Sequence, residues 1–358
     1  MNSTRTTLDR PVVSGSVLRT RGDRLSLRWQ PRAGVVCVLL ALAAAAVAIL
    51  GLTTGDYPVS LPSVLATLSG QGSGTDAFIV GTLRLPRVLS ALLIGAALGM
   101  SGAVFQSLSR NPLGSPDIIG FTSGAAVGAV TEILVFRGSQ TAIAFAAIGG
   151  GLITAAVVYL LSVRRGKVAG YRLILIGIGA GAVLESVTAY LLTRATLYDA
   201  QNAQIWLIGS LNAVSWEVVG PLAGALLILT PVVLFLGRDL GWMELGDGSA
   251  KGLGVPVERT RLLLVITATA LCAAATAAAG PIGFVALAAP QLCRRLVRAP
   301  GALIGPAGFM GALLLSASDF GAQRIVPTTS LPVGVMTGLL GGAYLCWLLA
   351  HQWKARRS

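Results

Sequence analysis

The chain has 358 residues, of which 54% are hydrophobic and only 11% charged, and its formal net charge is +13. Soluble domains carry about 25% charged residues, so this composition excludes an ordinary soluble protein. The positive charge does not indicate nucleic-acid binding. It lies in short segments beside apolar stretches, where anionic lipid headgroups neutralise it.

Ten apolar stretches follow one another, and most approach the roughly 20 residues that a helix needs to cross a bilayer. They cover residues 34–52, 88–107, 118–136, 142–162, 173–193, 219–236, 262–279, 282–292, 302–320 and 331–350. The stretch 282–292 is short for a span. When the gaps are assigned alternately to two sides, one side holds 22 Lys and Arg residues and the other 5. Because basic residues stay on the cytoplasmic side, we predict an all-α integral membrane protein with about ten spans and both termini cytoplasmic.

The predicted organisation is a single membrane domain over residues 34–350 with two basic tails. The N-terminal tail, 1–33, carries seven Arg and is expected to be disordered or to lie on the membrane surface. It is too long and polar for the charged region of a cleaved signal peptide. The C-terminal tail, 351–358, is also basic.

Several kinds of chemistry are missing from the sequence. There is no phosphate-binding loop of the form G-x-x-x-x-G-K-[ST]. A single histidine argues against a histidine-based triad, and the four cysteines lack metal-ligand spacing. We therefore expect no enzyme active site, no metal site and no cofactor.

Few ionisable residues fall within the apolar stretches, so each is a candidate for function. Glu185 lies in the middle of the fifth stretch. It is expected to face a water-filled path or another subunit, or to be held by a private structural hydrogen bond. The first alternative also allows a transporter driven by an ion gradient, with Glu185 as the coupling group. Asp319 lies near the outer end of its stretch and is expected at the interface.

Three of the five basic residues assigned to the outer side stand out. Arg84, Arg87 and Arg324 fall in gaps assigned to the outer side. They are expected either to contact an acidic partner or anionic ligand, or to anchor the chain at lipid headgroups.

Two inner gaps have a composition typical of ordered structure. Residues 110–117 contain two prolines and a Gly-Ser pair, which predicts a structured turn. Residues 237–261 form the longest inner gap, and its glycine spacing predicts two short helices joined by a glycine turn. Within the stretches, Gly95-x-x-x-Gly99 and Gly177-x-x-x-Gly181 have the spacing that lets helix backbones pack closely.

A set of motifs, in this order and spacing, is highly specific. They are Leu83-Arg-Leu-Pro-Arg87, Ser101-Gly-Ala-Val-Phe-Gln106, Asn111-Pro-Leu113 with Pro116-Asp-Ile-Ile-Gly120, Trp206-Leu-Ile-Gly-Ser210, Leu245-Gly-Asp247 with Leu253-Gly-Val255, Gly280-Pro-Ile-Gly-Phe-Val285 and Leu331-Pro-Val-Gly334. Over residues 34–350 the chain resembles the permease subunits of ABC importers for iron-siderophores, haem and cobalamin.

The resemblance implies a BtuC-like permease fold, that of type II ABC importers, in the bacterial plasma membrane. It implies three kinds of partner: a second permease subunit, identical or paralogous; two separate ATPase subunits; and an extracytoplasmic substrate-binding protein. By position it implicates Arg84 and Arg87, with Arg324 less securely, in docking the binding protein.

The same resemblance assigns residues on the cytoplasmic side. The ATPase-coupling loop comprises Leu245, Gly246, Asp247, Lys251, Leu253 and Gly254. The gate comprises Asn111, Pro112 and Leu113, with Glu185 as a further candidate for the translocation path.

The chain departs from the family pattern at Gln291, where a histidine is common, and at Gln323 and Ser330 near the third outer arginine. These variants favour the ferric-enterobactin type of siderophore permease over the cobalamin type. Import of a ferric siderophore is therefore the leading prediction, with cobalamin or haem import as alternatives on the same fold.

Overall fold

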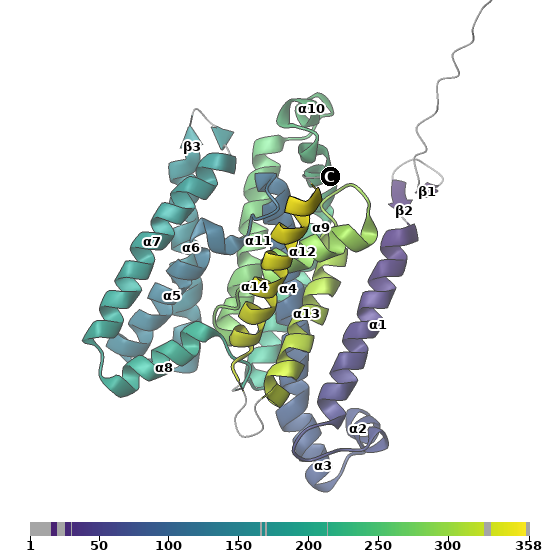
Figure 1. The fold of residues 1–358 in the computed structure, drawn as a ribbon, viewed down its shortest axis with the longest axis vertical. Coiled ribbons are helices and arrows are strands. Elements are labelled where there is room, and N and C mark those ends of the chain that lie inside the picture. The colour runs from purple at the N-terminus through teal and green to yellow at the C-terminus, as the bar shows by residue number, and fades with distance from the viewer. Residues whose placement is uncertain are drawn as a thin grey trace, which may run out of the picture.

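The computed structural model describes residues 16–19, 26–29, 31–164, 167–168, 170–212, 214–325 and 331–355. These residues are almost entirely helical, with long helices running roughly side by side (Figure 1). The elements are β1 (Ser16–Arg19), β2 (Ser26–Trp29), α1 (Pro31–Thr53), α2 (Leu61–Leu68), α3 (Gly74–Phe78), η1 (Ile79–Arg84), α4 (Leu85–Ser109), η2 (Pro116–Ile119), α5 (Phe121–Thr131), η3 (Glu132–Phe136), α6 (Gln140–Ser162), β3 (Val163–Arg164), β4 (Lys167–Val168), α7 (Gly170–Arg194), α8 (Leu197–Ile208), α9 (Trp216–Glu244), α10 (Asp247–Gly252), α11 (Val257–Ala279), α12 (Val285–Val297), α13 (Ile304–Ile325) and α14 (Val333–Ala355).

Every predicted apolar stretch contains a long part of one of these helices. Within the described residues, six helices are long and apolar enough to cross a membrane: Pro31–Thr53, Gly74–Ser109, Gln140–Ser162, Arg172–Arg194, Trp216–Glu244 and Val257–Ala279. The prediction of a multi-pass helical protein is thus confirmed, whereas the count of ten spans stays a prediction. Helix α12 has 13 residues. At 1.5 Å per residue it is about 20 Å long, short of the roughly 30 Å hydrocarbon core.

Helix α4 forms the centre of the bundle. Its membrane-length window is 78% buried, whereas the corresponding window of α1 is 17% buried. Three of its glycines make this possible, because they bring its backbone against the neighbouring backbones. A Cβ atom on Gly95, Gly99 or Gly102 would overlap the carbonyl oxygen of Gly311, Ala307 or Ala286, on α13 and α12. The close packing predicted from the Gly95–Gly99 spacing is confirmed.

The gap between the first two predicted apolar stretches, residues 53–87, is largely helical. Ser60 caps α2 by accepting a hydrogen bond from the Ser63 backbone N–H, and a proline follows in the first turn, both typical of helix starts. Helix α3 and η1 then continue directly into α4. The Trp216 indole donates to the Gly81 carbonyl at 2.8 Å, tying this region to the start of α9.

The two ends of the bundle are distinct. Helix α10, the β1–β2 pair and the C-terminal end of α14 lie at one end, and α2 and α3 lie at the other (Figure 1). This places the first and last described elements at the end predicted to be cytoplasmic. Most of the predicted N-terminal tail lies outside the described residues, but Ser16–Arg19 pairs antiparallel with Ser26–Trp29. Of the C-terminal tail, residues 351–355 continue α14.

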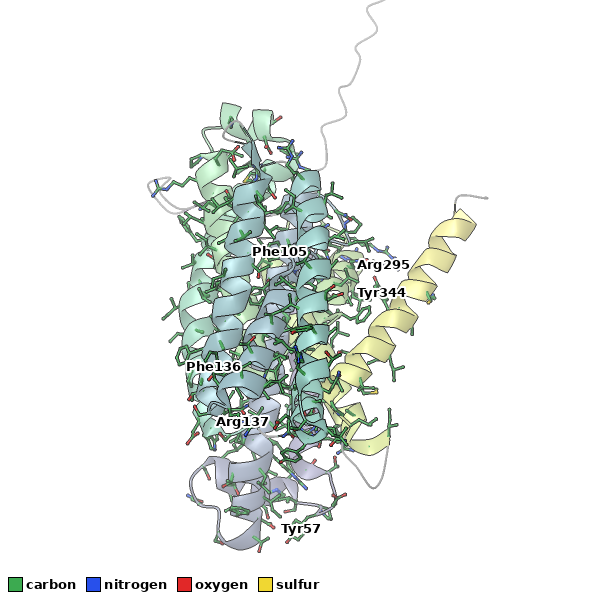
Figure 2. The ribbon with its side chains drawn as sticks, turned by 90° about the vertical axis from the view of Figure 1, so that its left-hand side faces the viewer. Tyr57, Phe105, Phe136, Arg137, Arg295 and Tyr344 are labelled. Atoms are coloured by element: carbon green, nitrogen blue, oxygen red, sulfur yellow. The ribbon has the colours of Figure 1, made fainter. Side chains whose placement is uncertain are left out.

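Helix α14 is inclined to the bundle, and its C-terminal half stands away from it (Figure 2). The Arg295 guanidinium on α12 lies 5.9 Å from the Tyr344 ring centroid and 4.9 Å from that of Trp347. These cation–π contacts join the C-terminal part of α12 to the middle of α14.

Candidate functional site

The predicted coupling loop is a short, well-anchored projection. Helix α9 continues to Glu244, so the loop contains one short helix, α10, rather than the predicted two. Glycines with positive φ stand on either side, Gly246 at 115° and Gly254 at 85°, a region that favours glycine. Buried Met243, Ala250 and Val257 pack together and fix α10 between α9 and α11.

Several large apolar side chains of this projection are exposed. Leu245 is 66% exposed, Leu253 is 60% exposed and Trp242 is 49% exposed. Lys251 and Gly248 are also exposed. Contiguous exposed apolar surface marks sites of contact with other proteins.

Asp247, by contrast, points back into the permease. Its Oδ1 lies 2.8 Å from Arg110 Nη2 and its Oδ2 lies 2.8 Å from Arg261 Nη2. Burial alone would raise the pKa of Asp247, but the hydrogen bonds and charges of Arg261 and Arg110 outweigh this and hold the pKa below its ordinary value. The carboxylate is therefore ionised at neutral pH and joins three elements: α10, α11 and the end of α4.

The predicted gate residues form an ordered turn directly after Arg110. Arg110 ends α4 with a left-handed φ of 49°. The Asn111 side-chain oxygen accepts from the Leu113 backbone N–H at 2.9 Å, and Gln291 donates to the Pro112 carbonyl at 2.7 Å. Leu113 itself is 46% exposed. The prediction of a structured turn is confirmed.

A cavity of about 400 Å³ opens beside this turn, lined by residues of α4, α9, α12 and the following loop. Arg110, Pro112, Glu244 and Arg294 contribute to its wall. The charged cytoplasmic ends of these helices thus surround the gate turn.

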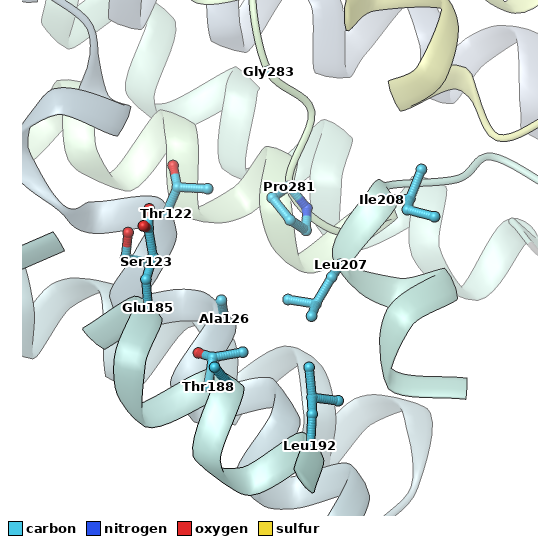
Figure 3. A pocket seen from close by; sticks show the side chains of 11 residues that line it. Thr122, Ser123, Ala126, Glu185, Thr188, Leu192, Leu207, Ile208, Pro281 and Gly283 are labelled. Carbon is cyan, nitrogen blue, oxygen red and sulfur yellow. The ribbon is translucent and has the colours of Figure 1, made fainter. Parts of the chain in front are cut away.

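Glu185 lines an open groove of about 460 Å³ between α5, α7, α8 and the loop before α12 (Figure 3). Thr122, Ser123 and Thr188 add hydroxyl groups on the Glu185 side, and Leu207 and Pro281 face them across the groove. The Glu185 side chain is exposed and makes no hydrogen bond or ion pair with the described residues. The role of Glu185 stays a prediction.

At the opposite end, Arg87 forms an internal ion pair. Its guanidinium contacts Asp319 through two nitrogens, with Nη2–Oδ1 at 2.8 Å and Nε–Oδ2 at 3.0 Å. Gln323 donates to the same carboxylate at 2.7 Å. The Asp319 side chain is only 4% exposed and that of Arg87 is 17% exposed. The Asp319 carboxylate is therefore buried within the protein, where Arg87 compensates its charge, and its depth in the membrane stays a prediction.

Arg84 and Arg324 converge on the outer end of α1. Arg84 donates to the carbonyls of Leu52 at 2.8 Å and Tyr57 at 2.6 Å. Arg324 donates to the Thr54 hydroxyl and lies over the Phe320 ring. The last carbonyls of a helix attract cations, so both arginines also stabilise the end of α1.

Sequence reasoning missed the partners that complete these clusters. Arg110 and Arg261 are separated from Asp247 by 137 and 14 residues, and Arg87 from Asp319 by 232 residues. The Leu-Gly-Asp motif indicated that Asp247 matters, but only the fold shows what it contacts.

The chain has membrane-length helices around a buried central helix. One end carries an apolar projection and the other carries Arg84, Arg324 and the Arg87–Asp319 ion pair. This arrangement is typical of a multi-pass membrane transport subunit. Residues 40–351 match the FecCD transport family, to which the chain therefore belongs. It is 44% identical over 318 residues to the ferric enterobactin transport system permease protein FepG of Escherichia coli, covering 89% of this chain and 96% of that protein. It is 36% identical over 333 residues to the Fe(3+)-citrate import system permease protein YfmE of Bacillus subtilis, covering 92% and 98%.

A solved structure described as an inward-facing conformation of a putative metal-chelate type ABC transporter has the same fold. The TM-score is 0.78 at 29% identity, over 89% of this chain and 99% of that chain. The resemblance inferred from the motifs is thereby confirmed.

Proposed function

We propose that this chain is the permease subunit of an ATP-driven importer that moves a ferric siderophore across the bacterial plasma membrane by alternating access. The observation that carries the proposal is the family relationship over nearly the whole chain, with iron-chelate permeases among its relatives. Residues 34–350 form the permease domain with ten spans, and the tails 1–33 and 351–358 lie in the cytoplasm.

ATP hydrolysis takes place on two separate ATPase subunits that dock on the α10 projection. The exposed Leu245 and Leu253 support this assignment, because they offer apolar side chains for contact with another protein. Gly246 and Gly254 give the projection its shape, and Lys251 stands exposed beside it.

A second permease subunit completes the translocation path. The groove that contains Glu185 supports this, since it is open on one side in the single chain and combines hydroxyl and carboxylate groups with an apolar wall. Asn111, Pro112 and Leu113 close the path at its cytoplasmic end.

An extracytoplasmic binding protein delivers the substrate to the outer face. Arg84, Arg87 and Arg324 are the candidates for contacting its acidic residues. Arg324 and Arg84 present the more available charge, because Arg87 is already neutralised by Asp319. Electrostatic matching of this kind sets register and association rate more than affinity.

The test is uptake of radioactive iron, offered on a panel of siderophores, in cells that lack this chain and in cells where it is restored. Loss and rescue for one chelator class would support the proposal and name the substrate. Unchanged iron uptake in starved cells without a redundant system would contradict it, and cobalamin and haem would then be tested.

A further inference from the structure

Asp247 divides its two carboxylate oxygens between two arginines with different surroundings. Arg261, on α11, is 10% exposed at its side chain and also contacts Glu258 at 3.0 Å. Arg110, at the end of α4, is 51% exposed and has no second carboxylate within ion-pair distance among the described residues. Arg261 is therefore the more firmly held partner of Asp247, and the more exposed Arg110 contact is the easier one to break.

Arg110 also contacts the end of α9. The same Nη2 atom that meets Asp247 donates to the Met243 carbonyl at 2.9 Å. Met243 and Asp247 lie on either side of the Gly246 turn from which α10 starts. A movement of α10 relative to α9 must therefore change the position of the Arg110 guanidinium or break its contacts.

Arg110 is connected directly to the gate turn, Asn111–Leu113, without a flexible segment between them. Its backbone lies in the left-handed region, with φ of 49°, and the next residue is Asn111. The turn is closed by the Asn111–Leu113 hydrogen bond and attached to α12 through the Gln291–Pro112 hydrogen bond. A displacement of Arg110 is thus passed to an ordered turn rather than absorbed by a loose one.

We propose that Arg110 is the positioning residue through which movement of α10 reaches the gate turn, and that Asp247 acts on Arg110 inside the permease rather than on the ATPase. The inference rests on the proposed function, since it concerns coupling to an ATPase. The Arg110–Asp247 pair is about half exposed, and exposed ion pairs contribute little to stability. It is therefore weak enough to break and re-form in each cycle, as a contact between two states of similar energy requires.

The test uses the purified permease reconstituted in liposomes with its ATPase and binding protein, measuring substrate taken up and ATP hydrolysed in the same sample. For Arg110→Gln we expect uptake per ATP to fall by at least about fivefold, the lower end of typical coupling between sites, while ATP hydrolysis continues. Arg110→Lys keeps the charge and should keep most of the coupling. Arg259→Gln is the matched control: Arg259 is exposed on the first turn of α11 and does not contact Asp247.

A double-mutant cycle identifies the route. If Arg110 acts through Asp247, adding Arg110→Gln to Asp247→Asn causes no further loss of uptake per ATP. Effects that multiply would overturn the proposal. Co-purification with the ATPase is measured for each variant, because a loss of assembly, or an equal fall of uptake and ATP hydrolysis, would show that Arg110 serves docking instead. A wild-type complex without ATP-dependent uptake would contradict the proposed function itself, and the inference with it.

Discussion

Arg87 on α4 and Asp319 on α13 form a two-nitrogen ion pair at the outer end of two closely packed helices. Below the pair, the backbones of α4 and α13 touch at Gly95 and Gly99. The polar contact and the glycine contacts therefore fix the same two helices at different depths, so α4 and α13 should move as one body during transport.

Neutralising Asp319 should destabilise the protein strongly. Asp319→Asn leaves Arg87 without its counter-charge in a largely buried site, and breaking such a pair costs about 3–5 kcal/mol. Thermal unfolding of the detergent-solubilised protein measures the loss. The charge exchange Arg87→Asp with Asp319→Arg should recover part of it. If Asp319→Asn unfolds at the wild-type temperature, the ion pair has no structural role.

The matched control for this experiment is Arg137→Gln. Arg137 pairs with Asp199 at 3.4 Å, but its side chain is 71% exposed. Such surface pairs contribute about 0–1 kcal/mol, so the control should unfold close to the wild-type temperature.

The glycines of α4 should tolerate no side chain. Gly102→Ala places a methyl group on the Ala286 carbonyl and forces α4 and α12 apart, which should lower the unfolding temperature by several degrees. Gly224→Ala is the control, because nothing lies within 4 Å of the added methyl group. Alanine is favoured over glycine inside a helix by about 1 kcal/mol, so this variant should be neutral or slightly stabilised. Equal behaviour of the two variants would contradict the packing account.

Glu185 should be reachable from water in the assembled transporter. We expect a membrane-impermeant thiol reagent to label Glu185→Cys in a background where Cys37, Cys272, Cys293 and Cys346 are replaced by alanine. Val183→Cys is the control: Val183 is 64% exposed in the single chain but lies about 200° around α7, on the face expected to meet lipid. Labelling of the Val183→Cys variant together with protection of the Glu185→Cys variant would place the path elsewhere.

The Asp247 contacts should persist over the physiological pH range. Because the folded-state pKa of Asp247 is lowered, its contribution to stability is present above the unfolded pKa of about 3.9. It is lost as the pH falls through the lower folded pKa. The difference in unfolding temperature between wild type and Asp247→Asn should therefore be constant between about pH 5 and pH 8 and shrink only below about pH 4. A difference that already shrinks near neutral pH would show that another group carries the effect.

The sequence predicted the elements that depend on local pattern. The apolar stretches, the turn at Asn111–Leu113 and the close packing at Gly95 and Gly99 all follow from spacing and residue type. The helices between Thr53 and Leu85 were missed because their polar and Gly/Ser-rich composition is typical of a loop, although Ser60 is a helix cap.

The ion pairs of the candidate site join residues that are far apart in the sequence. Nothing in the local sequence around Asp319 indicates Arg87, and the burial of that carboxylate follows only from the packing of α13 on α4. The extension of α9 to Glu244 was also missed, since Gly237 and Gly241 mimic a helix end. The contacts of Asp247 with Arg110 and Arg261 could be found only from the folded arrangement of α4, α10 and α11.

The most direct test of the central claim is transport in liposomes that contain this chain, its ATPase subunits and its binding protein. The account predicts uptake of a ferric siderophore that requires both ATP inside and loaded binding protein outside, and that an imposed proton gradient cannot replace. Uptake driven by the gradient without any ATPase, and abolished by Glu185→Gln, would contradict it and identify an ion-coupled transporter instead.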